Sequence, residues 1–329
     1  MLHIHNGGST AGTLKEFGFP GDHLAFQEVL MAGPAPAGLW LEAWREVRAR
    51  FLADEYELKF EDCRKDLLQQ EAALERFAEH DETILWFEHD LFCQINLIHL
   101  LDWFSKRALD KTRLSLICVG AFPGVEDFRG LGQLTGEQLA LLFGTRHQVT
   151  TEELGLAARA WAAYGSDNPE PIAQLIDQDL SALPFLEAAL RLHVMRFPSA
   201  TNGLGRVENK ALEIISDGPI GFKSLFPRFA KAEPTYGLGD SQFWNELKRL
   251  GKVRHPLIAI AGLDNPERSR KSNRFLEASF ELTEAGRAVL AGERDFIELN
   301  GIDLWLGGVH LTDASTWRWV EQNGRLVRW

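Results

Sequence analysis

Two short polar clusters hold residue types that could bind or react with a small molecule. One spans residues 6–10 and the other spans residues 88–90, and each directly follows a segment with the apolar pattern of a strand. Glycines and hydroxyls before a helix suit the binding of an anion, whereas carboxylates and imidazole suit general acid–base catalysis. If both strands belong to one parallel sheet, their carboxyl ends meet at one edge and the clusters face one crevice.

The first cluster predicts an anion site. A helix is expected to start directly after the glycines that follow the strand at residues 2–5. The unpaired N–H groups of its first turn and the positive end of its dipole would then point at the sheet edge, where they stabilise a phosphate or carboxylate. A hydroxyl here either binds the anion or caps the helix, and both interpretations stay open. The predicted ligand-binding residues are Asn6, Gly7, Gly8, Ser9 and Thr10.

The second cluster predicts the catalytic residues Glu88, His89 and Asp90. Side chains alternate along a strand, so Glu88 and Asp90 would share one direction if the strand continues, with His89 opposite. If a helix starts at Asp90 instead, its carboxylate caps that helix, and Gln94 lies one turn further on the same face. Gln94 is therefore assigned to the ligand site, with a histidine or carboxylate as general base.

Two other chemistries use the same residues. Ser9, His89 and Asp90 could form a nucleophilic triad, but no G-x-S-x-G elbow supports it. His3 and His5 share a strand face and could bind a metal with His89 or Asp90, but no H-E-x-x-H or similar spacing is present. We therefore assign no metal ligand, and the cofactor stays unknown.

The elements that position these clusters predict an α/β fold. Strands are expected at residues 2–5, 23–27, 83–87 and 113–120, and helices at 39–54, 59–80 and 91–104. Helices long enough to cross over between strands imply a parallel sheet with helices on its faces. The loop after the last strand carries Arg129, which either reaches the anion or forms a surface salt bridge. Arg129 is included among the ligand-binding residues.

Composition narrows the class of protein. With 329 residues, 45% hydrophobic and 25% charged, the chain is predicted to be soluble and to have more than one domain. The net charge of −12 argues against a surface built throughout for nucleic acid. Cys63, Cys93 and Cys118 form no C-x-x-C motif, which argues against a disulfide framework and favours the cytoplasm. Neither a signal peptide nor a membrane segment is expected.

The pattern along the chain predicts four parts. These are an α/β domain with a ligand crevice at 1–133, a helical bridge at 134–200, a winged-helix-like module at 201–295 and a Trp-rich β tail at 296–329. The module is expected to contain three helices, a two-stranded hairpin and a closing helix, and a linker is expected at 199–203. Asn323-Gly324 predicts a hairpin in the tail, which should pack back on the body because its tryptophans need burial.

The module suggests an alternative function in nucleic-acid binding. Residues 248–274 contain eight basic residues against two acidic ones, in the third helix and the wing. The candidate contacts are Lys248, Arg249, Lys252, Arg268, Arg270, Lys271 and Arg274. The third helix also carries Phe243, Trp244 and acidic neighbours, which make it a poor reader of a DNA groove.

Four segments together resemble the bacterial family known as domain of unknown function 1835, over essentially the whole chain. They are HIHNGGSTAGTLKE, LWFEHDLFCQ, GLGQL, and NGIDLWLGGVHL followed by WRW. The resemblance implies no activity, cofactor or catalytic residue. In the family pattern an acidic residue is common where this chain has Gly8, aspartate where it has Cys93, and arginine where it has Leu304.

These observations favour a cytoplasmic protein that binds a small anionic ligand, phosphorylated or nucleotide-like, at the carboxyl edge of the N-terminal sheet. Hydrolysis or group transfer on that ligand is the reaction class considered, and whether the protein is an enzyme stays open. The first alternative is a ligand-responsive, nucleic-acid-binding regulator. The second is a partner-binding protein without catalysis. The oligomeric state is not predicted.

Overall fold

The computed structural model describes residues 1–263 and 274–329 and divides the chain into two compact units. The first comprises Met1–Arg191 and Trp305–Val309, and the second comprises Leu192–Leu304 and His310–Trp329. These limits differ from the predicted divisions after residues 133, 200 and 295. The helices up to Arg191 belong with the sheet, and the C-terminal segment contributes to both units.

A five-stranded sheet forms the centre of the first unit. Its strands are β1 (Leu2–Asn6), β2 (Asp22–Phe26), β4 (Glu82–Glu88), β5 (Arg113–Val119) and β6 (His147–Gln148), in the order β2-β1-β4-β5-β6. β2, β1, β4 and β5 run parallel, which confirms the predicted α/β fold with a parallel sheet. β6 is an antiparallel edge strand that was not predicted, because two exposed residues carry no periodic pattern.

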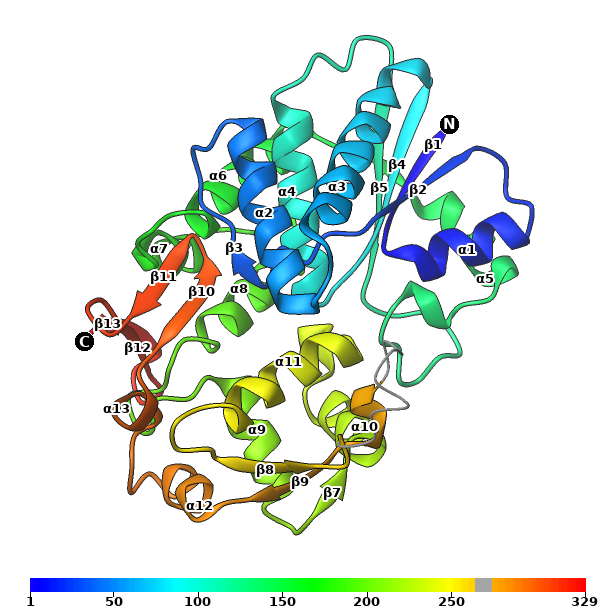
Figure 1. The fold of residues 1–329 in the computed structure, drawn as a ribbon. Coiled ribbons are helices and arrows are strands. Elements are labelled where there is room, and N and C mark those ends of the chain that lie inside the picture. Colours follow the sequence, from blue (N-terminus) through cyan, green and yellow to red (C-terminus); the bar gives the residue numbers. More distant parts are fainter. Residues whose placement is uncertain (264–273) are drawn as a thin grey trace. The chain divides into compact units, whose positions relative to one another are not determined.

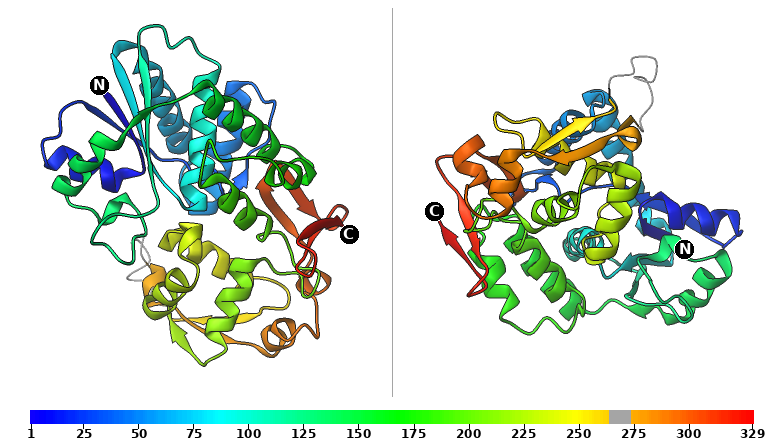
Figure 2. Two further views of the ribbon diagram at one scale, coloured as in Figure 1. Left: turned by 180° about the vertical axis from the view of Figure 1, so that it is seen from behind. Right: turned by 90° about the horizontal axis from the view of Figure 1, so that it is seen from below.

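Helices cover both faces of this sheet (Figure 1). The helices up to Val194 are α1 (Gly8–Glu16), α2 (Leu41–Tyr56), α3 (Phe60–Glu75), α4 (Leu91–Ser105), α5 (Gly136–Leu142), α6 (Thr151–Tyr164), α7 (Glu170–Ile176) and α8 (Leu186–Val194), with short 3₁₀ turns η1 (Arg76–Glu79), η2 (Leu131–Gln133) and η3 (Phe143–Thr145). α1 and α5 lie on one face and α2, α3, α4 and α6 on the other, as the view from behind in Figure 2 also shows. Within the described chain, no helix is both long and apolar enough to span a bilayer.

The connections of the sheet explain the two layers. β1 leads through α1 to β2 on one side, whereas β4 leads through α4 to β5 on the other. Such crossovers are right-handed. A helix that connects strands toward one edge of the sheet and a helix that connects strands toward the other edge therefore lie on opposite faces. The direction in which the chain adds strands changes between β1 and β4, which makes this position the switch point of the sheet. Parallel sheets usually bind ligands in a crevice at the switch point.

A short C-terminal segment completes the first unit. β3 (Gly33–Pro34) pairs in parallel with the end of β10 (Asp303–Gly307). Glycine is required there, since a Cβ on Gly307 would lie 2.3 Å from the carbonyl oxygen of Tyr164. Residues 305–309 are thus part of the first unit and not of a separate tail.

A buried ion pair anchors the segment after β2. Arg48 in α2 is fully buried, and its guanidinium donates to both carboxylate oxygens of Glu28 at 2.9 and 2.8 Å. Further donors of Arg48 bind the carbonyls of Val29, Ala32 and Pro34. The N–H groups of Arg48 therefore all have acceptors. The ion pair of Arg48 and Glu28 thus holds the segment after β2 in one conformation.

The second unit has helices followed by antiparallel strands. Its elements are α9 (Arg206–Ile215), β7 (Ile220–Gly221), α10 (Phe222–Ala232), η4 (Pro234–Tyr236), α11 (Asp240–Gly251), β8 (Ile258–Ala261), η6 (Arg274–Glu277), β9 (Ser279–Leu282), α12 (Glu284–Leu290) and α13 (Phe296–Asn300). The strands form a sheet in the order β7-β9-β8. The second strand of the predicted hairpin, expected at 275–281, is shorter in the structure, because residues up to Glu277 form the 3₁₀ turn η6. The order of the helices and strands agrees with the sequence, while the winged-helix assignment stays a prediction.

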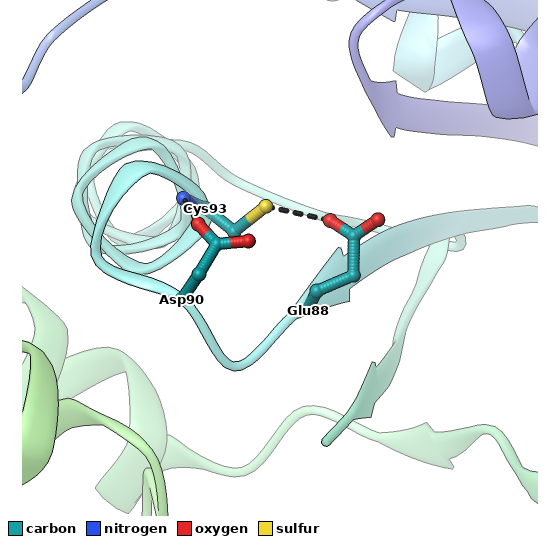
Figure 3. Close-up of side chains that lie close together, drawn as sticks. All are labelled: Glu88, Asp90 and Cys93. Carbon is teal, nitrogen blue, oxygen red and sulfur yellow. Dashed lines mark hydrogen bonds between the residues drawn. The ribbon is translucent and has the colours of Figure 1, made fainter. Parts of the chain in front are cut away.

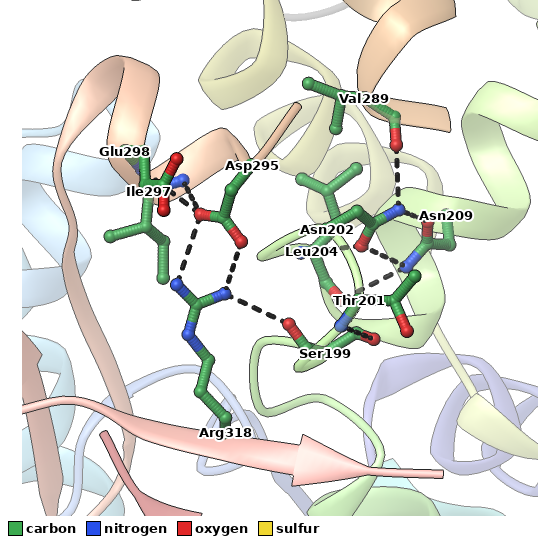
Figure 4. Close-up of polar contacts among 10 residues, drawn as sticks. All are labelled: Ser199, Thr201, Asn202, Leu204, Asn209, Val289, Asp295, Ile297, Glu298 and Arg318. Atoms are coloured by element: carbon green, nitrogen blue, oxygen red, sulfur yellow. Dashed lines mark hydrogen bonds and ion pairs between the residues drawn. The ribbon is translucent and has the colours of Figure 1, made fainter. Parts of the chain in front are cut away.

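The C-terminal hairpin packs on the predicted linker. β11 (Val309–Thr312) is followed by β12 (Trp317–Val320), which pairs antiparallel with β13 (Arg325–Arg328), as Asn323-Gly324 predicted. The amides of Trp319 and Ala200 donate to the carbonyls of Pro198 and Trp319. Asn202 is buried and bonded to Asn209 and to the carbonyl of Val289 (Figure 4). Segment 199–203 is therefore an anchored turn, and its prediction as a linker was wrong.

Arg318 is the main polar anchor of the hairpin (Figure 4). It is buried, binds both carboxylate oxygens of Asp295 at 2.7 and 3.1 Å, and donates to the carbonyl of Ser199 at 3.0 Å. We expect Arg318→Met to lower the unfolding free energy by about 2 kcal/mol, because hydrogen bonds to a charged group are lost. Denaturant unfolding measures this, with the exposed Arg325→Met on the same hairpin as control. Equal effects of the two substitutions would contradict the anchoring role.

Candidate functional site

The glycine turn lies at the end of β1, next to the switch point. β1 ends at Asn6, Gly7 adopts φ 93°, and α1 begins at Gly8. Gly7 is the N-cap, and the first turn has neither a side-chain cap nor an acidic residue. The interpretation of Ser9 or Thr10 as the cap was therefore wrong: both lie inside the helix, with Ser9 exposed and Thr10 buried. No side chain of a described residue accepts a hydrogen bond from the first N–H groups of α1.

The acidic cluster lies at the end of the neighbouring strand. β4 ends at Glu88, and Asp90 is the N-cap of α4, accepting the amide of Cys93 at 2.8 Å. Of the two interpretations of Asp90, the helix cap is confirmed. Figure 3 shows the side chains of Glu88, Asp90 and Cys93 gathered at this turn. Since β1 and β4 are adjacent and parallel, both predicted clusters lie at the same edge of the sheet.

Hydrogen bonds connect the two strand ends through Cys93. Its thiol donates to Oε2 of Glu88 at 2.6 Å, and the side-chain amide of Asn6 donates to the sulfur of Cys93 at 2.8 Å. Asn96, one turn later in α4, donates to the side-chain oxygen of Asn6 and to the carbonyl of Glu28. A continuous network therefore runs from the buried pair of Glu28 to Glu88.

Burial shapes the acidity of this cluster. Glu88 is only 8% exposed, and burial, reinforced by the charge of Asp90, raises its pKa to about 7. Burial likewise raises the pKa of Asp90 and holds the pKa of the Cys93 thiol well above its usual range. Glu88 can thus exchange a proton near neutral pH, as a general base requires, whereas the thiol of Cys93 is not a ready nucleophile.

His89 packs beside two aromatic rings. Its ring is half-buried near the rings of Phe128 and Phe185, 6.3 and 6.0 Å away between centroids. Its Nδ1 atom has no hydrogen-bond partner among the residues that the structure describes. A triad of Ser9, His89 and Asp90 is not favoured, because Asp90 caps α4 and His89 packs against aromatic rings.

The loop after β5 lies against both clusters. The amide of Leu131 in η2 donates to Oε1 of Glu88 at 2.7 Å. A Cβ on Gly132 would come 3.1 Å from the hydroxyl of Ser9, and a Cβ on Gly130 would come 2.9 Å from Oε1 of Glu88. These glycines allow the loop to pass close to both groups. The turn of α1 is exposed, but η2 shields Glu88 from solvent.

Gln94 and Arg129 differ in their relation to the site. Gln94 is buried and donates to the backbone carbonyl of Glu88 at 2.7 Å, so it supports the end of β4. Arg129 is exposed, and its backbone amide bonds to Gln133. It forms neither the predicted surface ion pair nor a contact with the acidic cluster within the described chain.

The histidines of β1 form a structural stack. His3 donates from Nε2 to the carbonyl of Pro20 and accepts the indole N–H of Trp86 on Nδ1. His23 donates from Nε2 to the carbonyl of Phe19, so its Nδ1 accepts from Nε2 of His5. These bonds assign neutral tautomers to the histidines and use most of their ring nitrogens. They provide no metal site of the kind considered from the sequence.

The basic residues that were proposed to contact nucleic acid differ in their surroundings, and only some of them are described by the structure. Arg249 pairs with Glu208 and Glu246, so it is engaged within the second unit. Lys248 is half-buried on α11 and Lys252 is exposed. The remaining candidates, Arg268, Arg270, Lys271 and the side chain of Arg274, lie outside the described residues.

Comparison with known proteins assigns no function. The chain matches no model of a known protein family. A comparison with curated proteins found no match either. The resemblance to domain of unknown function 1835 therefore stays a prediction, and the site has to be interpreted from its own geometry.

Some residues of the site escaped sequence reasoning. Cys93 was considered only as an isolated thiol, although a residue three positions after an N-cap lies beside the capping side chain. Asn96 was overlooked, although it is a polar residue in an otherwise apolar stretch of α4. The contact of Leu131 with Glu88 left no signal, because it uses only a backbone amide.

Proposed function

We propose that the first unit binds a small anionic ligand, with a phosphate or carboxylate held by the first turn of α1. The observation that carries this proposal is the uncapped start of α1 beside the switch point between β1 and β4. Backbone N–H groups without a side-chain acceptor, together with the helix dipole, stabilise an anion. Open space supports access, since a Cβ on Gly7 would meet no atom within 4 Å.

The structure supports binding better than catalysis. The hydroxyl of Ser9 is exposed next to the free N–H groups, whereas Glu88 is shielded by η2. A hydrolase or transferase with Glu88 as general base would therefore require residues 130–132 to move away when the ligand binds. The acidic cluster also repels an anion wherever it is ionised, which places the anionic group at α1 and not at Glu88.

We expect Ser9→Asp to abolish anion binding without harming the fold. A carboxylate in the first turn of α1 occupies the anion site, while it favours the helix dipole by about 0.3–1 kcal/mol. Wild-type protein should show an increased melting temperature with inorganic phosphate or with AMP, and the variant should show no increase.

The matched control is Ser9→Asn, because asparagine has the same size as aspartate and carries no charge. It should retain the thermal response to phosphate or AMP. The proposal would be wrong if neither compound stabilises the wild type, or if Ser9→Asp responds as strongly as Ser9→Asn.

Nucleic-acid binding is the second candidate and has less support. The pairing of Arg249 with two carboxylates removes one predicted contact, and the exposure of Lys252 retains another. Retention on DNA that falls steeply with salt would favour this function, provided that neutralising Arg268, Arg270 and Lys271 removes the retention.

A further inference from the structure

Most buried carboxylates of the described chain have a cationic partner. The pairs with arginine or lysine are Glu28 with Arg48, Glu82 with Arg113 and Arg146, Asp102 with Lys106, and Glu208 with Arg249. Glu88 and Asp90 are equally buried, at 8% and 4% exposure, yet neither forms an ion pair with a described residue. Buried carboxylates normally pair with a cation or coordinate a metal.

A third potential ligand lies beside these two carboxylates. One oxygen of Glu88, one oxygen of Asp90 and the sulfur of Cys93 all lie within 4.8 Å of one another. The residues come from the end of β4 and the first turn of α4, so the backbone holds them together (Figure 3). Such a convergence of buried oxygen and sulfur donors, without a balancing positive charge, is suited to a metal ion.

We propose that Glu88, Asp90 and Cys93 bind a divalent transition-metal ion of the Zn²⁺ class. The sulfur donor selects Zn²⁺ or Co²⁺ over Mg²⁺ and Ca²⁺, which prefer oxygen ligands only. On binding, the thiol of Cys93 releases its proton to solvent, and two carboxylates and one thiolate then surround the ion. The sequence predicted no metal ligand, because it contains no H-E-x-x-H, C-x-x-C or similar spacing.

Neighbouring groups support each of the three ligands. The amide of Asn6 donates to the sulfur, the backbone amide of Leu131 donates to Oε1 of Glu88, and the backbone amide of Cys93 donates to Oδ1 of Asp90. Such outer contacts orient metal ligands and stabilise their charged forms. Oε2 of Glu88 accepts the thiol of Cys93, so this oxygen becomes available to the ion once that thiol has lost its proton. Metal binding here does not depend on anion binding at α1.

The test is a Co²⁺ titration of the full chain after treatment with a chelator. We expect one Co²⁺ per chain, a sulfur-to-cobalt charge-transfer band in the near ultraviolet, and loss of that band when Zn²⁺ displaces Co²⁺. Zn²⁺ should raise the melting temperature, and Mg²⁺ at the same concentration should not.

Variants assign the band to this cluster. Cys93→Ser should abolish the charge-transfer band and weaken Zn²⁺ binding at least tenfold. Cys63→Ser, which alters a buried cysteine on α3 outside the cluster, should preserve both. Glu88→Gln should also weaken Zn²⁺ binding, and in chelator it should melt no lower than wild type, because it removes an unpaired buried carboxylate.

Three results would overturn the metal site. They are the absence of Co²⁺ and Zn²⁺ binding by the folded wild type, a charge-transfer band that persists in Cys93→Ser, and a thermal response to Mg²⁺ equal to that of Zn²⁺. Ser9→Asp separates this site from the anion site, since it should retain the cobalt band while it loses the response to phosphate.

Discussion

Replacing Arg48 by methionine is expected to lower the unfolding free energy by about 3–5 kcal/mol, the range for breaking a buried ion pair. The large effect follows from the buried groups that are left without a partner when Arg48 is replaced. Glu28 is 3% exposed, and without Arg48 its carboxylate has no cation to balance its charge. The carbonyls of Ala32 and Pro34 also lose their donor. Urea unfolding followed by circular dichroism measures the change.

Two further variants test this explanation. Arg48→Met combined with Glu28→Gln should recover part of the loss, since no ionised carboxylate stays buried. Arg113→Met is the matched control: Arg113 also pairs with a buried glutamate, but its side chain is 52% exposed and Arg146 binds the same Glu82. The control should cost much less than Arg48→Met, because solvent screens an exposed ion pair. A similar cost for Arg48→Met and Arg113→Met would refute the argument.

Stability is also expected to fall as the pH decreases from 6.5 to 4. Burial lowers the pKa of His3 to about 4 and that of His5 to about 2, and the pKa values of His23, His99 and His193 are also lowered. Above pH 6.5 these histidines are neutral in both states and have no effect. Below pH 6.5 the unfolded chain binds protons that the folded chain does not, so the folded state loses stability.

Buried carboxyl groups act in the opposite direction. The pKa of Glu88 is raised to about 7, and those of Asp90 and Glu208 are also raised, so these groups add stability as the pH falls toward their unfolded values. Five histidines outnumber three carboxyls. Between pH 6.5 and 5, His3, His5 and His99 each contribute a loss of about 1.4 kcal/mol per pH unit, and Glu88 offsets one of the three, so stability is expected to fall with decreasing pH.

The slope of stability against pH is the measured quantity. Urea unfolding at pH 7, 6 and 5 should give a falling free energy, and His5→Gln should flatten that fall. Loss of a hydrogen bond in the variant would shift the unfolding free energy by the same amount at all three pH values. It would therefore leave the slope of stability against pH unchanged. A wild-type stability that stays constant or rises between pH 7 and 5 would contradict the prediction.

The sequence by itself determined where the main elements lie. The apolar runs of β4 and β5, the helix-length apolar segment between them and the Asn323-Gly324 turn are local patterns, and local backbone preferences are enough to specify them. It also located both polar clusters at strand ends. Because the strands of a parallel sheet all end at the same edge, the carboxyl ends of β1 and β4 could be expected at one edge of the sheet.

Only the tertiary structure decided which side chains meet at that edge. Cys93 bridges Glu88 and Asn6, and the backbone of Leu131 covers Glu88, because residues distant in sequence pack together there. The same holds for residues 305–309, which return to the first unit from the far end of the chain. Contacts of this kind depend on shape and burial across elements, and no local periodicity encodes them. The charge balance of the acidic cluster, on which the metal proposal rests, becomes visible only once every neighbour has been placed.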